Sequence, residues 1–98
     1  MDMLLILSML DRVWYLMNKL LVTVFVLCLE NQYDLMLPIN ISVKDAIELI
    51  QKSIYELTEH SYQINYNACL YDEDGKVINQ NNIIKFSGLK NGSKVMLV

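Results

Sequence analysis

The 98-residue sequence is long enough for one domain with a single modest hydrophobic core. Hydrophobic residues make up 54% of it and charged residues only 19%, which excludes an intrinsically disordered chain. The net charge of −3, with no cluster of Lys and Arg, argues against a nucleic-acid or anionic-membrane surface.

Residues 1–29 are strongly apolar, but they match neither a secretory signal nor a membrane span. The first charged residue is the acidic Asp2, whereas a signal begins with a basic region and ends at small residues. A membrane span needs roughly 20 uninterrupted apolar residues. Polar side chains divide this stretch into shorter pieces: Asp11, Arg12, Asn18 and Lys19.

We therefore divide the chain into an apolar extension, residues 1–16, and a domain, residues 17–98. The extension is interpreted either as the product of a misassigned start codon or as a short added helix. Membrane association through residues 1–29 is kept as an alternative.

The domain opens with a predicted β-hairpin. Residues 19–29 are rich in β-branched and aromatic side chains, which favours a central strand over a helix. A polar turn at 30–32 leads to a second strand at 33–39. Pro38 lies near its end, where a missing N–H group is tolerated.

A helix is predicted over residues 43–59. Ser42 is a good N-cap residue, and Asp45 places an acid in the first turn. Apolar residues at spacings of three and four form one stripe for the core: Val43, Ala46, Ile47, Ile50, Ile54 and Leu57. The polar residues are expected on the other faces: Lys44, Glu48, Gln51, Lys52, Glu56 and Glu59.

Three short strands complete the pattern, at residues 68–71, 76–78 and 94–98. Gly75 permits a tight acidic turn between the first two, which is too short for a calcium-binding EF-hand loop. Ile83 and Ile84 are expected in a short loop or 3₁₀ segment that plugs the core. Asn91-Gly92 forms the last turn. A hairpin, one helix and further strands indicate an α+β fold, with the helix (about 43–59) across one face of a mixed sheet of four to five strands.

No residue pattern indicates catalysis. Cys28 and Cys69 stand far apart in apolar runs, so we expect buried thiols in a reducing compartment. His60 is interpreted as a solvated residue near a helix end. Because the chain contains no Ser/His/Asp or Cys/His arrangement, no glycine-rich phosphate loop and no metal-ligand spacing, we predict a non-enzyme without cofactor or metal.

The element order, the Ser42-led helix and the closing segment 86–97 resemble the ubiquitin-like (β-grasp) superfamily. Within it, residues 17–98 are most similar to the YukD/EsaB group of type VII secretion accessory proteins. The resemblance implies a β-grasp fold with its first and last strands parallel at the sheet centre. It also implies a cytoplasmic interaction or regulatory protein of a bacterial type VII secretion system. The alternative is a structural, oligomer-forming β-grasp protein without a secretion role.

Ubiquitin-like modifiers and sulfur carriers react through a carboxylate on a slender C-terminal diglycine tail. This sequence closes at Val98 without that tail, so we expect neither activity. Binding is the remaining role, and strand alternation directs Val95 and Leu97 to the helix.

The same alternation predicts an apolar partner-binding patch on the open face of the sheet, formed by Cys69, Tyr71, Met96 and Val98. The first strand should add to this patch because it is apolar on both sides. Three occupants are compatible with the sequence: a protein partner, a second copy of the chain, or residues 1–16.

Overall fold

The computed structural model describes residues 18–98, and the predicted extension of residues 1–16 lies outside them. The described part contains four strands: β1 (Lys19–Val26), β2 (Asn31–Pro38), β3 (Leu70–Tyr71) and β4 (Ser93–Leu97). One α-helix, α2 (Val43–Leu57), follows the opening hairpin, and there are two short 3₁₀ turns, η1 (Leu27–Leu29) and η2 (Ile84–Phe86).

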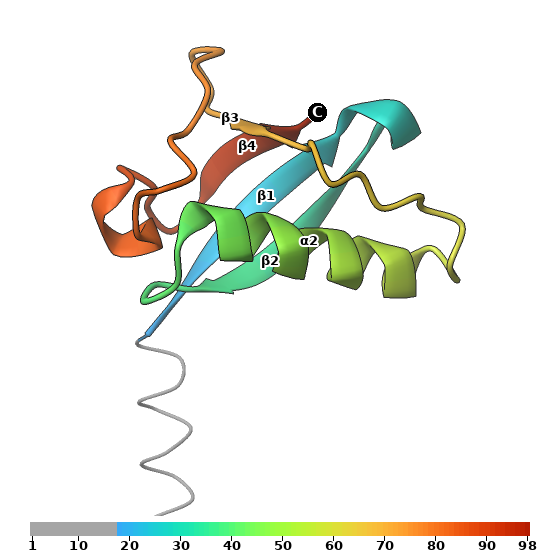
Figure 1. Cartoon of the computed structure of the whole chain (residues 1–98), viewed down its shortest axis with the longest axis horizontal. Helices are drawn as coiled ribbons and strands as arrows, with labels where there is room; N and C mark the ends of the chain where they lie inside the picture. Colours follow the sequence, from blue (N-terminus) through green and yellow to red (C-terminus); the bar gives the residue numbers. More distant parts are fainter. Residues whose placement is uncertain (1–17) are drawn as a thin grey trace, which may run out of the picture.

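The strands form one mixed sheet in the order β2-β1-β4-β3 (Figure 1). β1 pairs antiparallel with β2 and parallel with β4, and β4 pairs antiparallel with β3. The two most apolar strands therefore lie side by side at the sheet centre, as predicted.

The Asn91-Gly92 turn fixes where the parallel pairing of β1 and β4 begins. Asn91 Oδ1 accepts a hydrogen bond of 2.9 Å from the Leu21 N–H group, and the Gly92 N–H group donates to the Leu21 carbonyl at 2.8 Å. Gly92 has φ +85°, a conformation that glycine adopts at little cost. The turn thus sets the register of the central strands.

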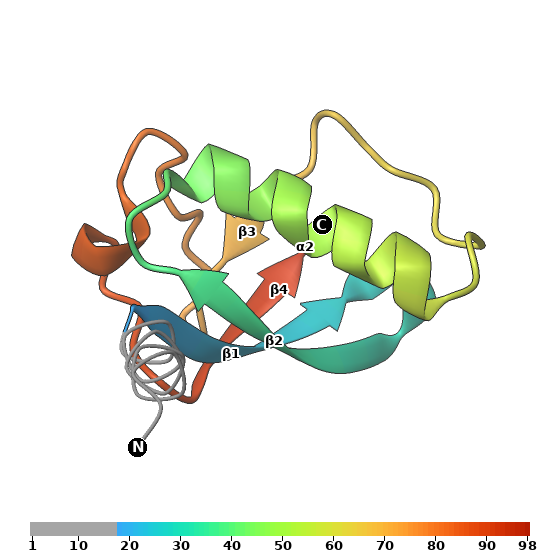
Figure 2. The ribbon, with the colours of Figure 1, turned by 90° about the horizontal axis from the view of Figure 1, so that it is seen from below.

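Helix α2 crosses one face of the sheet (Figure 2). Its buried residues are Val43, Ala46, Ile47, Gln51, Ile50 and Ile54. They pack into a core with the inward residues of the central strands: Val22, Val24, Val26, Val95 and Leu97. Ile84 of η2 is fully buried in the same core, as predicted, but Ile83 is 38% exposed and does not plug the core with it.

Two positions of the predicted helix differ in burial from the prediction. Leu57 is 60% exposed, because the helix ends there and the chain turns away from the sheet. Gln51 was expected on a polar face but is only 3% exposed. Its amide group is buried because it binds the following loop.

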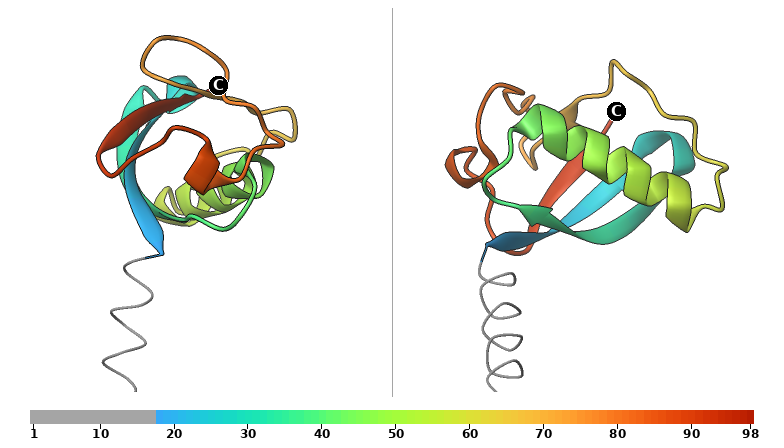
Figure 3. Two further views of the ribbon diagram at one scale, coloured as in Figure 1. Left: turned by 90° about the vertical axis from the view of Figure 1, so that its left-hand side faces the viewer. Right: turned by 60° about the horizontal axis from the view of Figure 1, so that its bottom comes forward.

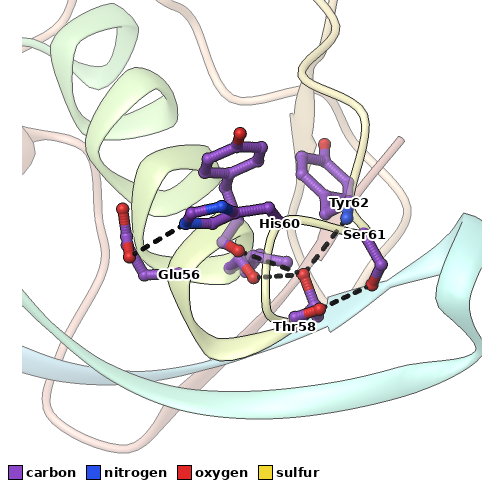
Figure 4. A network of polar contacts seen from close by, with 7 residues as sticks. Glu56, Thr58, His60, Ser61 and Tyr62 are labelled. Carbon is purple, nitrogen blue, oxygen red and sulfur yellow. Dashed lines mark hydrogen bonds and ion pairs between the residues drawn. The ribbon is translucent and has the colours of Figure 1, made fainter.

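The helix ends at Leu57 rather than at the predicted residue 59. Thr58 Oγ1 donates to the Ile54 carbonyl at 2.8 Å and accepts from the Tyr62 N–H group at 3.1 Å, as Figure 4 shows. Glu59 and His60 then adopt left-handed conformations with φ of +52° and +68°. A helix does not continue through such residues, so the chain reverses at this point.

Other boundaries also shift. β1 ends at Val26, and η1 with Glu30 at φ +50° completes the hairpin. This turn leaves Cys28 exposed, so the prediction of a buried thiol is wrong there, while Cys69 is half-buried. The predicted strand 76–78 is reduced to a single bridge between Tyr71 and Val77.

Candidate protein-interaction surface

The face of the sheet opposite α2 is not covered by any element within residues 18–98 (Figure 3, left). All four residues of the predicted patch lie at one end of this open face. Tyr71 is directly opposite Met96 in the β3–β4 ladder. Cys69 is opposite Val98, because the N–H group of each donates to the carbonyl of the other at 3.0 Å. Directly opposite residues project from the same face of a sheet.

The exposure of these side chains makes them available for contact. Met96 is 38% exposed and Val98 45%, while Cys69 and Tyr71 are half-buried. Their neighbours Val95, Leu97 and Leu70 point the other way and are buried. The side chains of β4 therefore alternate as predicted, with Val95 and Leu97 toward the core and Met96 outward.

Register extends the patch into a continuous apolar row. Phe25 of β1 neighbours Met96, and Val77 bridges to Tyr71 on the far side. We call these four residues, Phe25, Met96, Tyr71 and Val77, the apolar row. Val77 is 57% exposed, and the four-residue prediction did not include it. Only the long-range pairing with Tyr71 shows that it belongs here.

The remaining part of the open face combines apolar and polar groups. Leu21 of β1 and Met36 of β2 are paired and exposed. Between them and the apolar row lies a polar row, in which Thr23 Oγ1 donates to Asp34 Oδ1 at 2.7 Å. Lys94 neighbours Thr23 on the β4 side.

A shallow hollow adds shape at the β3 edge. It has a volume of about 280 Å³ and is lined by Tyr71, Asp72, Glu73, Gly75, Met96 and Val98. Glu73 Oε1 accepts a hydrogen bond of 3.2 Å from the Lys94 N–H group, which holds the acidic turn against the strand. The hollow lies beside the apolar row, with Tyr71 and Met96 belonging to both.

A larger groove of about 610 Å³ lies at the end of the sheet, between η1 and residues 61–65. One wall is held by Gln51, whose Oε1 accepts from the Tyr62 hydroxyl and from the Asn65 N–H group, each at 2.8 Å. Burial raises the pKa of Tyr62 above its usual value, and the nearby Cys28 thiol adds a smaller contribution in the same direction. The phenol therefore stays protonated and acts as a structural donor.

The described residues do not assemble a recognisable catalytic or metal-binding group. Within residues 18–98, no cluster of three His, Cys, Asp or Glu side chains could hold a metal ion. His60 stacks on Tyr55 with the rings 4.4 Å apart and lies 3.4 Å from Glu56 Oε2, at the end of α2. In that same part of the chain, no helix is long and apolar enough to cross a membrane.

Comparison with sequence families and curated proteins gives no match: no family model and no curated protein corresponds to this chain. Comparison with solved structures, in contrast, gives matches. The ubiquitin-like domain of the Mycobacterium tuberculosis type VII secretion protein EccD1 is 17% identical, with a TM-score of 0.61. The match covers 82% of this chain and 97% of that domain.

Two further structures are similar over the same span. The EccD5 ubiquitin-like domain from Mycobacterium xenopi is 15% identical, with a TM-score of 0.67, over 82% of this chain and 92% of that one. A structure described as molecular mimicry of SUMO promoting DNA repair is 18% identical, with a TM-score of 0.62, over 83% and 91%.

The mixed four-stranded sheet with one helix across it is a ubiquitin-like β-grasp fold, as predicted. The similar structures include ubiquitin-like domains of type VII secretion proteins. At identities below one fifth, the likeness concerns the fold alone.

Proposed function

We propose that the protein is a non-catalytic, cytoplasmic ubiquitin-like interaction protein that acts as an accessory component of a bacterial type VII secretion system, in the manner of the YukD/EsaB group. The observation that carries the proposal is the exposed apolar row on the open face of the sheet. Exposed contiguous apolar surface on a small domain usually marks a contact with another macromolecule.

Two further observations support this reading. The apolar row lies beside a hollow large enough to receive a partner's side chain, which gives the surface shape as well as apolar character. The similarity to EccD1 and EccD5 ubiquitin-like domains supports type VII secretion as the setting. The partner is then a protein subunit of that apparatus, and the contact centres on Tyr71 and Met96.

The test is complementation in the bacterium that encodes this chain. Deletion of the gene should reduce secretion of small helical type VII substrates, and the wild-type gene should restore it. Tyr71→Asp combined with Met96→Asp should fail to restore secretion, because two carboxylates would be desolvated in an apolar contact. Lys52→Asp on the exposed side of α2 is the matched control, since it changes the net charge by the same amount.

Val77→Asp provides a second variant, at a 57% exposed position outside the regular strands. It should reduce secretion while leaving the thermal unfolding temperature near that of the wild type. Normal secretion in the deletion strain, or full restoration by both patch variants, would contradict the proposal. A genome without a type VII secretion ATPase would contradict the assignment to type VII secretion.

A further inference from the structure

We infer that the β1-centred strip of the open face binds a second copy of this chain, around a two-fold axis parallel to β1. The strip comprises the outward positions of β1 and their neighbours on β2 and β4. The inference rests on the proposal that the open face is a contact surface, and it names an occupant for one part of that face.

The strip consists of three rows that cross the strands β2, β1 and β4 in that order. The registers place Asp34, Thr23 and Lys94 in the middle row. The row nearest the Asn91-Gly92 turn contains Met36, Leu21 and Gly92. The third row contains Gln32, Phe25 and Met96.

The middle row is oppositely charged on its two sides. Asp34 and Lys94 flank Thr23 and are both exposed. Neither forms an ion pair with another residue of the described range 18–98. Asp34 is held over Thr23 by the 2.7 Å hydrogen bond, so its position is fixed relative to β1.

Two copies facing each other through this strip are related by a two-fold axis in the plane of the contact. An axis parallel to β1 exchanges the two flanks and preserves the position along the strand. Asp34 of each copy then faces Lys94 of the other, which gives two complementary pairs. An axis across the strands would instead set Asp34 against Asp34 and Lys94 against Lys94. The charges therefore favour the axis parallel to β1, because only that axis brings opposite charges together.

The other two rows fit the same axis. Leu21 and Phe25 lie on it and meet their own copies, which buries apolar surface at the centre. Met36 faces Gly92 of the second copy, where no side chain occupies the space. Face-to-face sheets pack about 10 Å apart with strands within about 30° of each other, so the facing rows stay within reach of these side chains.

This arrangement leaves the β3 side of the open face outside the strip. Tyr71 and Val77 lie beyond β4 and remain available for a different protein, whereas Met96 belongs both to the strip and to the apolar row. A dimer would therefore carry two such surfaces, one on each side of the central contact.

The experiment is sedimentation equilibrium of the full-length chain with a charge-swap series. The wild type should dimerise, and Asp34→Lys or Lys94→Asp should each weaken dimerisation by about tenfold or more, because two attractive pairs become repulsive. The double variant Asp34→Lys/Lys94→Asp restores both pairs and should dimerise like the wild type. Raising the salt to about 0.5 M should weaken the wild-type dimer and strengthen those of the single variants.

Asp34→Asn is the control for the fold, since its side-chain oxygen still accepts the Thr23 hydrogen bond. It should weaken dimerisation less than Asp34→Lys. A wild-type chain that stays monomeric up to about 1 mM would overturn the inference, and residues 1–16 covering the strip would produce that result. A double variant no better than the single variants would also overturn it.

The two proposals fail separately. Val77→Asp lies outside the strip, so it should reduce secretion without changing the sedimentation result. If the charge swap shows no rescue while Val77→Asp still impairs secretion, the dimer is rejected and the proposed function stands. If sedimentation follows the predicted pattern but secretion is normal in every variant, the proposed function is rejected and the dimer stands.

Discussion

At the scale of single residues, Gln51 organises the long irregular connection after the helix. It lies in α2 yet is nearly fully buried, and its side chain makes three hydrogen bonds to Tyr62 and Asn65. Its Nε2 donates to the Asn65 carbonyl at 2.9 Å, while Oε1 accepts from the Tyr62 hydroxyl and the Asn65 N–H group. An amide can do both because it is donor and acceptor at once.

We predict that Gln51→Ala lowers the free energy of unfolding by about 2 kcal/mol, because three hydrogen bonds are lost and their partners lie partly or fully buried. Lys52→Ala, one residue away but exposed, should change it by less than about 0.5 kcal/mol. Urea denaturation measures both. Equal stability of the two variants would show that water replaces the amide at no cost.

At the scale of elements, the start of α2 connects two distant parts of the chain. The N–H groups of Val43 and Lys44 donate to the carbonyls of Asn82 and Gln80, at 2.8 and 3.1 Å. The Asp45 N–H group donates to Ser42 Oγ at 3.1 Å. These first N–H groups of a helix have no partner within it. Here all three are satisfied by the protein, so this helix terminus is not free to bind an anion.

Ser42→Ala should reduce the free energy of unfolding by about 1 kcal/mol, because the Asp45 N–H group loses its cap. Ser42→Asp restores a side-chain acceptor at the cap and should recover most of the loss. Both values come from denaturant unfolding with an unchanged m-value. If Ser42→Asp is as unstable as Ser42→Ala, the capping hydrogen bond is not the cause.

At the scale of the whole molecule, the element order was predictable because hydrophobic periodicity is local, whereas the parallel central strands were expected from the resemblance to the β-grasp superfamily. The inward phase of Val95 and Leu97 followed from the periodicity directly. Features set by long-range pairing were not predictable in this way. The outward placement of Val77 depends on its bridge to Tyr71, and the burial of Gln51 depends on a loop 14 residues further along the chain.

The candidate surface shows the same division. Strand alternation grouped Cys69 with Tyr71 and Met96 with Val98, since it needs only the period of two, and the strand pairing expected of the β-grasp fold brought the two pairs to one face. The continuation of the patch through Phe25 and the opposite charges of Asp34 and Lys94 required the register between strands. Alternation thus shows which side chains of a strand share a face, and the register between strands determines which of them are neighbours on that face.

The proposed contact between the open face of this ubiquitin-like fold and a secretion subunit can be tested position by position. The experiment is site-specific photo-crosslinking in the cells that encode this chain, with a photoreactive phenylalanine analogue in place of Tyr71 and, as control, of Lys52. We expect adducts with a subunit of the type VII secretion apparatus from position 71 and none from position 52. No adduct from position 71, or equal adducts from both positions, would contradict the proposed contact.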